Sequence, residues 1–130
     1  MAGLKENIDV TNIYETLRYV DMKKHPQHVI PLLPAMVRTF PKLNGQLGVW
    51  LFTGERWGNI GLIKASEVLG KDGWPVVAAM KAMLPELMTR PEKEKRSAKE
   101  FQAAIEAVKK AIEAYETKYG AVKAGPSTKA

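Results

Sequence analysis

Two short apolar runs flank a polar, glycine-containing segment in the middle of the chain, within residues 46–65. The segment between them, TGERWGN at residues 53–59, has the composition of a hairpin turn. On the first predicted strand the apolar side chains alternate between the two faces: Leu47, Val49 and Leu51 on one, Trp50 and Phe52 on the other. Both faces therefore need cover, one from the chain's own helices and one from a second copy. The pattern predicts an antiparallel hairpin in a homo-oligomer, most simply a dimer.

Before the hairpin, residues 12–22 (NIYETLRYVDM) are rich in β-branched and aromatic side chains and predict a first strand. After a polar turn, apolar residues recur at helical spacing from residue 29 to residue 40. Pro31 and Pro34 fit only the first turn of a helix, so the regular helix is expected to begin near Pro31 or to be kinked there. Pro41 is expected to end it.

After the hairpin, apolar residues between Val76 and Leu87 predict a second helix, whose first turn accepts Pro75. Pro85 and Pro91 are expected to break or bend the chain.

The last predicted element is a long amphipathic helix. Residues 97–100 (SAKE) have the form of a capping box, and Gly120 offers a stop. Its apolar stripe comprises Phe101, Ala104, Ile105, Val108, Ala111, Ile112, Tyr115 and Tyr119. Residues 121–130 are expected to form a disordered tail.

The predicted order is strand, helix, strand, strand, helix and an added long helix. A length of 130 residues fits one domain with its own core, here residues 1–120. The predicted fold class is α+β: a ferredoxin-like, dimeric α+β barrel with an antiparallel sheet and an added C-terminal helix. The plan normally has a fourth strand, and its only candidate, residues 84–89, contains Pro85, which would confine it to a sheet edge.

Residues 12–80 resemble the dimeric α+β barrel superfamily, and within it the NIPSNAP-like group. The resemblance rests on the opening IYETLRYVDMK with Arg18 and Tyr19, the GQLGVW approach to the second strand, the GLIKASEV segment and Trp74 near the second helix. It implies sheets paired across a dimer and a small cavity between the helices and sheet of each protomer. Some members of the superfamily are cofactor-free monooxygenases, and others bind haem.

Composition and charge indicate whether the protein binds nucleic acid or spans a membrane. The net charge of +6 suggests nucleic acid, but glutamates interrupt the basic residues of segment 90–100 (RPEKEKRSAKE), which is typical of a solvated surface. Nucleic-acid binding is therefore unlikely on this pattern. The chain has no cysteine and no apolar run near the roughly 20 residues of a membrane span. We expect a cytoplasmic protein that is not embedded in a membrane.

Five residues are candidates for a ligand pocket: Tyr14, Arg18, Trp50, Phe52 and Trp57. Aromatic rings with one cation suit a planar apolar ligand that bears an acidic or carbonyl group. Packing in a core or a dimer interface would use the same side chains. No general base is identifiable, so the catalytic residues are unknown.

A metal site is not expected. His25 and His28 are three residues apart and could bind a metal together with Asp21, but a stable site needs three or four converging ligands. A surface turn explains the two histidines as well. No cofactor is predicted.

Two functions follow from these observations. The first is a homo-oligomeric barrel that binds a small, largely apolar molecule between sheet and helices, with cofactor-independent turnover as an option. The second is a noncatalytic accessory protein that docks on a partner through its C-terminal helix. The docking stripe would comprise Phe101, Ile105, Val108, Ile112 and Tyr115.

Overall fold

The structure, a computed structural model, describes residues 24–42, 46–54 and 60–123. Within these ranges every regular element is a helix and none is a strand. The predicted α+β class, with its ferredoxin-like barrel and antiparallel sheet, is therefore wrong. The resemblance to the dimeric α+β barrels and their NIPSNAP-like group is overturned with it, because helices occupy much of the segment that the resemblance assigns to a hairpin.

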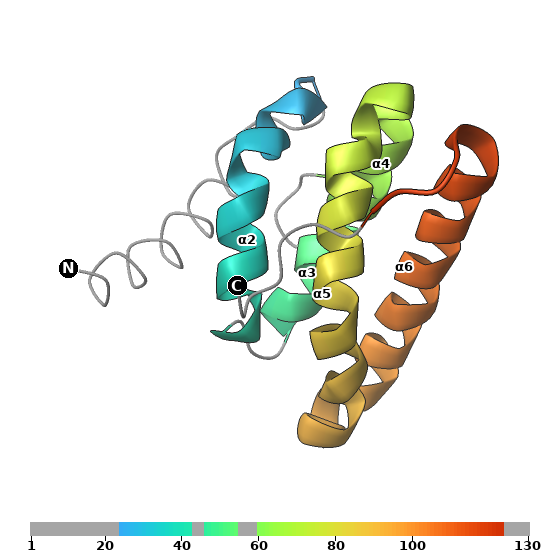
Figure 1. Ribbon diagram of the computed structural model, residues 1–130. Helices are drawn as coiled ribbons and strands as arrows, with labels where there is room; N and C mark the ends of the chain where they lie inside the picture. The colour runs from blue at the N-terminus through green and yellow to red at the C-terminus, as the bar shows by residue number, and fades with distance from the viewer. Residues whose placement is uncertain (1–23, 43–45, 55–59, 124–130) are drawn as a thin grey trace.

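The described chain folds as a layered helical bundle (Figure 1). Its elements, where η marks a 3₁₀ helix, are η1 (Pro26–Leu32), α2 (Leu33–Thr39), η2 (Phe40–Lys42), α3 (Gln46–Thr53), α4 (Leu62–Leu69), η4 (Gly70–Gly73), α5 (Trp74–Lys93), η5 (Lys95–Ser97) and α6 (Ala98–Tyr119). Helices α5 and α6 lie side by side and run in opposite directions (Figure 1). Helix α5 also packs against α2 and α4, and α3 packs against α4 and α6.

The first predicted hairpin strand is helix α3. Gly48, Leu51 and Phe52 follow the spacing that places residues on one helical face, and all three are buried. A short continuous apolar run fits a buried helix as well as a buried strand, so the alternation of side chains did not decide between them. The second predicted strand is also helical: α4 begins at Leu62, directly after Gly61. Most of the predicted turn, residues 55–59, lies outside the described residues.

The predicted first strand at residues 12–22 also lies outside the described residues. The helix that was expected after it is present in two parts: Pro31 lies within the 3₁₀ helix η1, and the α-helical part, α2, begins at Leu33. Pro34 occupies the first turn of α2, where a missing N–H costs nothing. Pro41 falls in η2, just after α2 ends.

The second predicted helix is confirmed as α5, but it does not break at its prolines. Pro85 and Pro91 both lie inside its 20 residues. Pro85 is exposed, whereas Met80, Met83 and Leu87 on either side of it are buried. Packing of this apolar face holds the segment helical although proline disfavours a helix interior.

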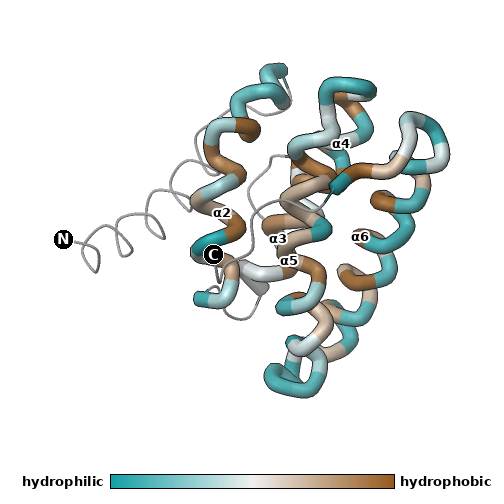
Figure 2. The backbone as a smooth tube through the Cα atoms, viewed as in Figure 1, coloured by the Kyte–Doolittle hydropathy of each residue, from teal (hydrophilic) through white to brown (hydrophobic). Residues whose placement is uncertain are grey.

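The long C-terminal helix is confirmed as α6. It ends at Gly120, whose φ of 100° lies in the region that glycine tolerates best. Ser97 is the N-cap residue, but its side chain makes no capping hydrogen bond, so the capping box does not form. Hydrophobic positions of α6 lie on the side toward α5, and hydrophilic positions lie on the outer side (Figure 2).

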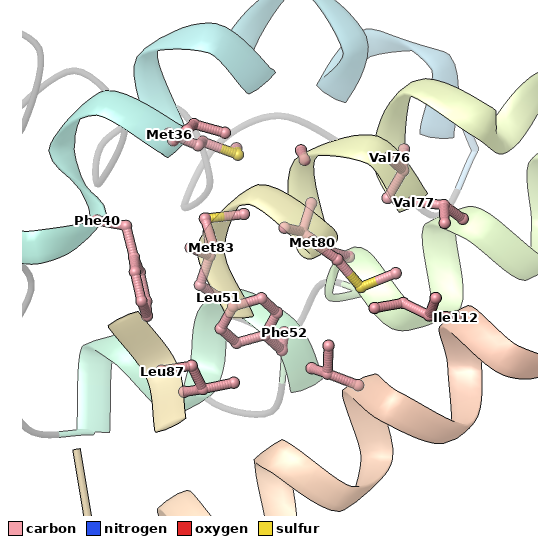
Figure 3. Packing of buried hydrophobic residues seen from close by; sticks show 14 of the residues in the cluster. Met36, Phe40, Leu51, Phe52, Val76, Val77, Met80, Met83, Leu87 and Ile112 are labelled. Carbon is pink, nitrogen blue, oxygen red and sulfur yellow. The ribbon is translucent and has the colours of Figure 1, made fainter. Parts of the chain in front are cut away.

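The core joins all the α-helices. Met36 of α2, Phe52 of α3, Met83 of α5 and Ile112 of α6 belong to one buried cluster (Figure 3). The ring of Phe40 meets that of Phe52 edge to face, with centroids 5.6 Å apart. Val49, Leu51 and Phe52, which were expected to need cover from a second copy, are instead buried within one chain.

Candidate functional site

An apolar groove lies where η1 and α2 approach the start of α5. It has a volume of about 380 Å³. Its lining comprises Ile30, Leu33, Pro34, Val37, Trp74, Pro75, Ala78 and Ala79. Trp74 is 59% exposed, which is unusual for the largest apolar side chain and makes it an accessible wall of the groove. We call this feature the α2–α5 groove.

The local sequence explains why the two helices leave a hollow. Ala78 and Ala79 follow the first turn of α5 and offer only methyl groups toward the neighbouring helix. Pro34 and Pro75 occupy the first turns of α2 and α5, where their rings fix the backbone without removing a helical hydrogen bond. The small alanines between larger walls therefore create a rigid apolar depression.

The groove supplies binding chemistry but no acid or base. Among the described residues that line it, none has an ionisable side chain. Its walls can offer burial of apolar surface, dispersion contacts and an indole face against which a flat group can stack. Nothing in this lining would transfer a proton.

The described part of the chain includes two of the five predicted ligand residues, and neither of them lines this groove. Tyr14, Arg18 and Trp57 lie outside the described residues. Trp50 and Phe52 lie in α3 and are not part of the groove: Trp50 is partly buried against the core, and Phe52 is fully buried against Phe40.

The sequence pattern did not predict the α2–α5 groove. Trp74 was singled out only by the family resemblance, and the alanines of α5 carried no chemical motif. A Trp-Pro pair at the start of a predicted helix, followed by two alanines one turn later, is the only signal that could have found the site. Even so, that signal does not show which helix lies opposite.

The stripe that was proposed for docking a partner is part of the core. Phe101, Ile105, Val108, Ile112 and Tyr115 are all buried, none more than 8% exposed. The hydroxyl of Tyr115 donates to the backbone oxygen of Lys71 at 2.9 Å, and burial raises the pKa of this phenol, with Tyr119 and Asp72 adding to the effect. A partner could reach the stripe only if α6 separated from the bundle.

A cluster of polar contacts surrounds Arg90, which is only 2% exposed. Its guanidinium donates to Glu86 at 3.2 Å and to Glu94 at 2.9 Å, and to the backbone oxygens of Phe40 at 3.0 Å and Pro41 at 3.3 Å. Burial pushes the pKa of the Glu86 carboxyl up, but hydrogen bonds from Thr89 and Arg90 and the charge of Lys93 outweigh it, so the pKa is lowered overall. These contacts join α5 to η2 and make Arg90 a structural group.

The histidines form a stacked pair on the surface. The rings of His25 and His28 are 5.0 Å apart, and both side chains are exposed. Across residues 24–42, 46–54 and 60–123, no group of three or more His, Cys, Asp or Glu side chains is placed to hold a metal ion. Asp21, the third ligand considered from the sequence, lies outside these ranges.

No protein-family model matches the chain, and neither does any curated protein or solved structure. In the part of the chain that the structure describes, no helix combines the length and apolar character needed to span a bilayer. The function must therefore be argued from the geometry of the chain itself.

Proposed function

We propose that this protein is a noncatalytic binding protein that takes a small, largely apolar molecule in the α2–α5 groove. The observation that carries the proposal is a hollow of about 380 Å³ whose described lining consists of apolar residues, with a half-exposed tryptophan in its wall. Ligand sites are concave, mostly apolar and about 300–1,000 Å³ in volume, so the groove lies at the small end of that range.

The composition of the lining indicates the class of ligand. A charged group placed there would lose water and gain no counter-charge from the described lining. An uncharged ring system or a short hydrocarbon would bury its surface against Leu33, Val37 and Ala78 and stack on Trp74. One chain supplies the whole described lining, so this function does not require a second copy.

We also propose a cytoplasmic location, because a chain without cysteine has no disulfide to gain from an oxidising compartment.

The test is the affinity of the protein for phenylnaphthylamine, an uncharged apolar dye whose fluorescence rises on burial. Replacing Trp74 with alanine removes the stacking face, which is worth about 1.4 kcal/mol and therefore weakens binding about tenfold. Filling the hollow with Ala78→Leu is expected to lower the affinity as well. Circular dichroism of each variant would show that the helices are retained.

Met88→Ala is the matched control. Met88 is an apolar residue of the same helix, is exposed to a similar degree at 50%, and is not part of the groove. The affinity should stay unchanged in this variant. Equal losses in Trp74→Ala and Met88→Ala, or no dye binding by the unaltered protein, would contradict the proposal.

A further inference from the structure

A second hollow, separate from the α2–α5 groove, lies between α5 and α6 and has a volume of about 500 Å³. Its lining comprises Lys81, Leu84, Lys109, Ile112, Glu113, Glu116, Thr117 and Ala121. Leu84, Ile112 and Ala121 are apolar, whereas the other lining residues are charged or polar. We call it the α5–α6 cavity.

The chain that follows α6 contributes to the wall of this cavity. At Gly120, with φ at 100°, the backbone leaves the helix, and the segment then runs from the end of α6 toward α5 (Figure 1). Val122 is 8% exposed and belongs to the core cluster, whereas Ala121 and Lys123 on either side of it are exposed. Residues 120–123, here called the strap, are therefore anchored by one apolar side chain.

Three short hydrogen bonds fix the strap in place. The Lys81 ammonium donates to the Glu116 carboxylate at 2.7 Å and to the backbone oxygen of Val122 at 2.6 Å. The same carboxylate oxygen accepts the backbone N–H of Val122 at 2.7 Å. Lys81 belongs to α5 and Glu116 to α6, so this group, here called the latch, ties both helices to the strap.

The latch depends on charge. Hydrogen bonds from Lys81 and then from the Val122 N–H lower the pKa of Glu116, although burial opposes the shift. Bonds in which a partner is ionised are shorter and about twice as strong as neutral ones. The two side chains are 29% and 25% exposed, so water and solutes can reach the latch. Lys109 and Glu113 also place charge on the described wall of the cavity.

We propose that the strap is a movable wall of the α5–α6 cavity and that the Lys81–Glu116 latch sets its position. Both latch residues and Ala121 of the strap line the cavity, so a change at the latch alters the cavity wall directly. When the latch opens, the strap swings about Gly120, and the exposure of Leu84, which is already partly exposed, and of Ile112 increases. This device is independent of the proposed function, because the two hollows share no lining residue.

Because the chain has no cysteine, a single introduced thiol reports access to the cavity. The experiment measures the rate at which a maleimide labels Leu84→Cys, alone and combined with Glu116→Gln. Loss of the charge-assisted bonds should raise this rate about tenfold. Glu113→Gln is the matched control: it removes a carboxylate one turn earlier, from the same cavity wall, and should leave the rate unchanged.

A second thiol, Glu106→Cys, on the exposed side of α6, separates strap opening from unfolding. The rate at which the maleimide labels this thiol should be the same in the original protein, in Glu116→Gln and in Glu113→Gln. Hydrogen exchange of the Val122 amide, measured without any thiol, should quicken in Glu116→Gln and in Lys81→Gln but not in Glu113→Gln. Equal rates at Leu84→Cys with Glu116→Gln and with Glu113→Gln would overturn the proposal. So would a faster rate at both thiols together, since this would mean that the whole bundle opens.

Discussion

Arg90 shows how one side chain can hold several segments of this bundle together. It is almost fully buried, and its guanidinium also lies 5.0 Å from the centroid of the Phe40 ring. A buried charge is tolerated only where partners replace the lost water. Glu86 lies one turn before it on α5, Glu94 is the residue directly after α5, and the carbonyls of η2 complete the set. The geometry therefore depends on η2 meeting α5 at this point.

Arg90→Ala should destabilise the protein by about 3 kcal/mol, because it removes a donor shared by two carboxylates, the buried carbonyl of Phe40 and the part-buried carbonyl of Pro41. The free energy of unfolding in urea measures this loss. Arg96→Ala in η5 removes the same charge from an exposed position and should change stability by no more than about 0.5 kcal/mol. Equal effects of the two substitutions would show that Arg90 is not a structural centre.

At the scale of elements, α5 shows packing overriding local preference. Its sequence contains two prolines that should end a helix, yet the helix runs from Trp74 to Lys93. The apolar residues around Pro85 belong to the core that α5 shares with α2, α3 and α6, and their burial outweighs the lost backbone hydrogen bond. Helix α3 is a second example. Its short apolar run is compatible with a strand or a helix, because eight residues are too few for the spacing of apolar positions to separate the two.

Pro85→Ala should stabilise the protein by about 1 kcal/mol or more, since alanine restores the backbone donor and relieves crowding inside α5. Pro75→Ala is the control, because proline is well placed in the first turn of a helix. That second substitution should be neutral or slightly destabilising. Thermal unfolding followed by circular dichroism compares the two. A loss of stability in Pro85→Ala would show that the helix relies on the bend that proline imposes.

At the scale of the whole molecule, α6 is part of one continuous core. Phe101 is fully buried near α3, where its ring would lie 3.3 Å from a Cβ added at Gly48. Helix α6 contacts α3, α4 and α5. Removing a side chain from its apolar stripe therefore lowers the stability of the entire bundle. A stripe reserved for a partner would not behave in this way.

Phe101→Ala should cost about 3–5 kcal/mol and lower the stability of all the helices together. Unfolding followed by circular dichroism and by tryptophan fluorescence should give the same midpoint. Gln102→Ala, the next residue and exposed, should stay within about 0.5 kcal/mol of the original protein. A variant in which α6 melts alone while the fluorescence transition is unchanged would support the docking hypothesis instead.

The structure removes the observation on which the predicted homo-oligomer was based. It rested on a strand with two apolar faces, and that segment is a helix whose Val49, Leu51 and Phe52 are buried within one chain. The association state stays a prediction, which native mass spectrometry of the unaltered protein can decide.

Local spacing alone predicts the helices whose apolar residues recur over many turns. The long stripe of α6 and its stop at Gly120 follow from spacing and from a residue that tolerates positive φ. The apolar face of α5 also followed from spacing. These features are local, so they need no knowledge of distant neighbours.

Only the tertiary structure decided the identity of the short elements and the location of the candidate sites. Eight residues of α3 are too few for periodicity to separate helix from strand, and packing against α4 and α6 made the choice. The α2–α5 groove arises because two alanines of one helix face larger side chains of another, far away along the chain. The latch likewise joins Lys81 to Glu116 across 35 positions, and no local pattern encodes that contact.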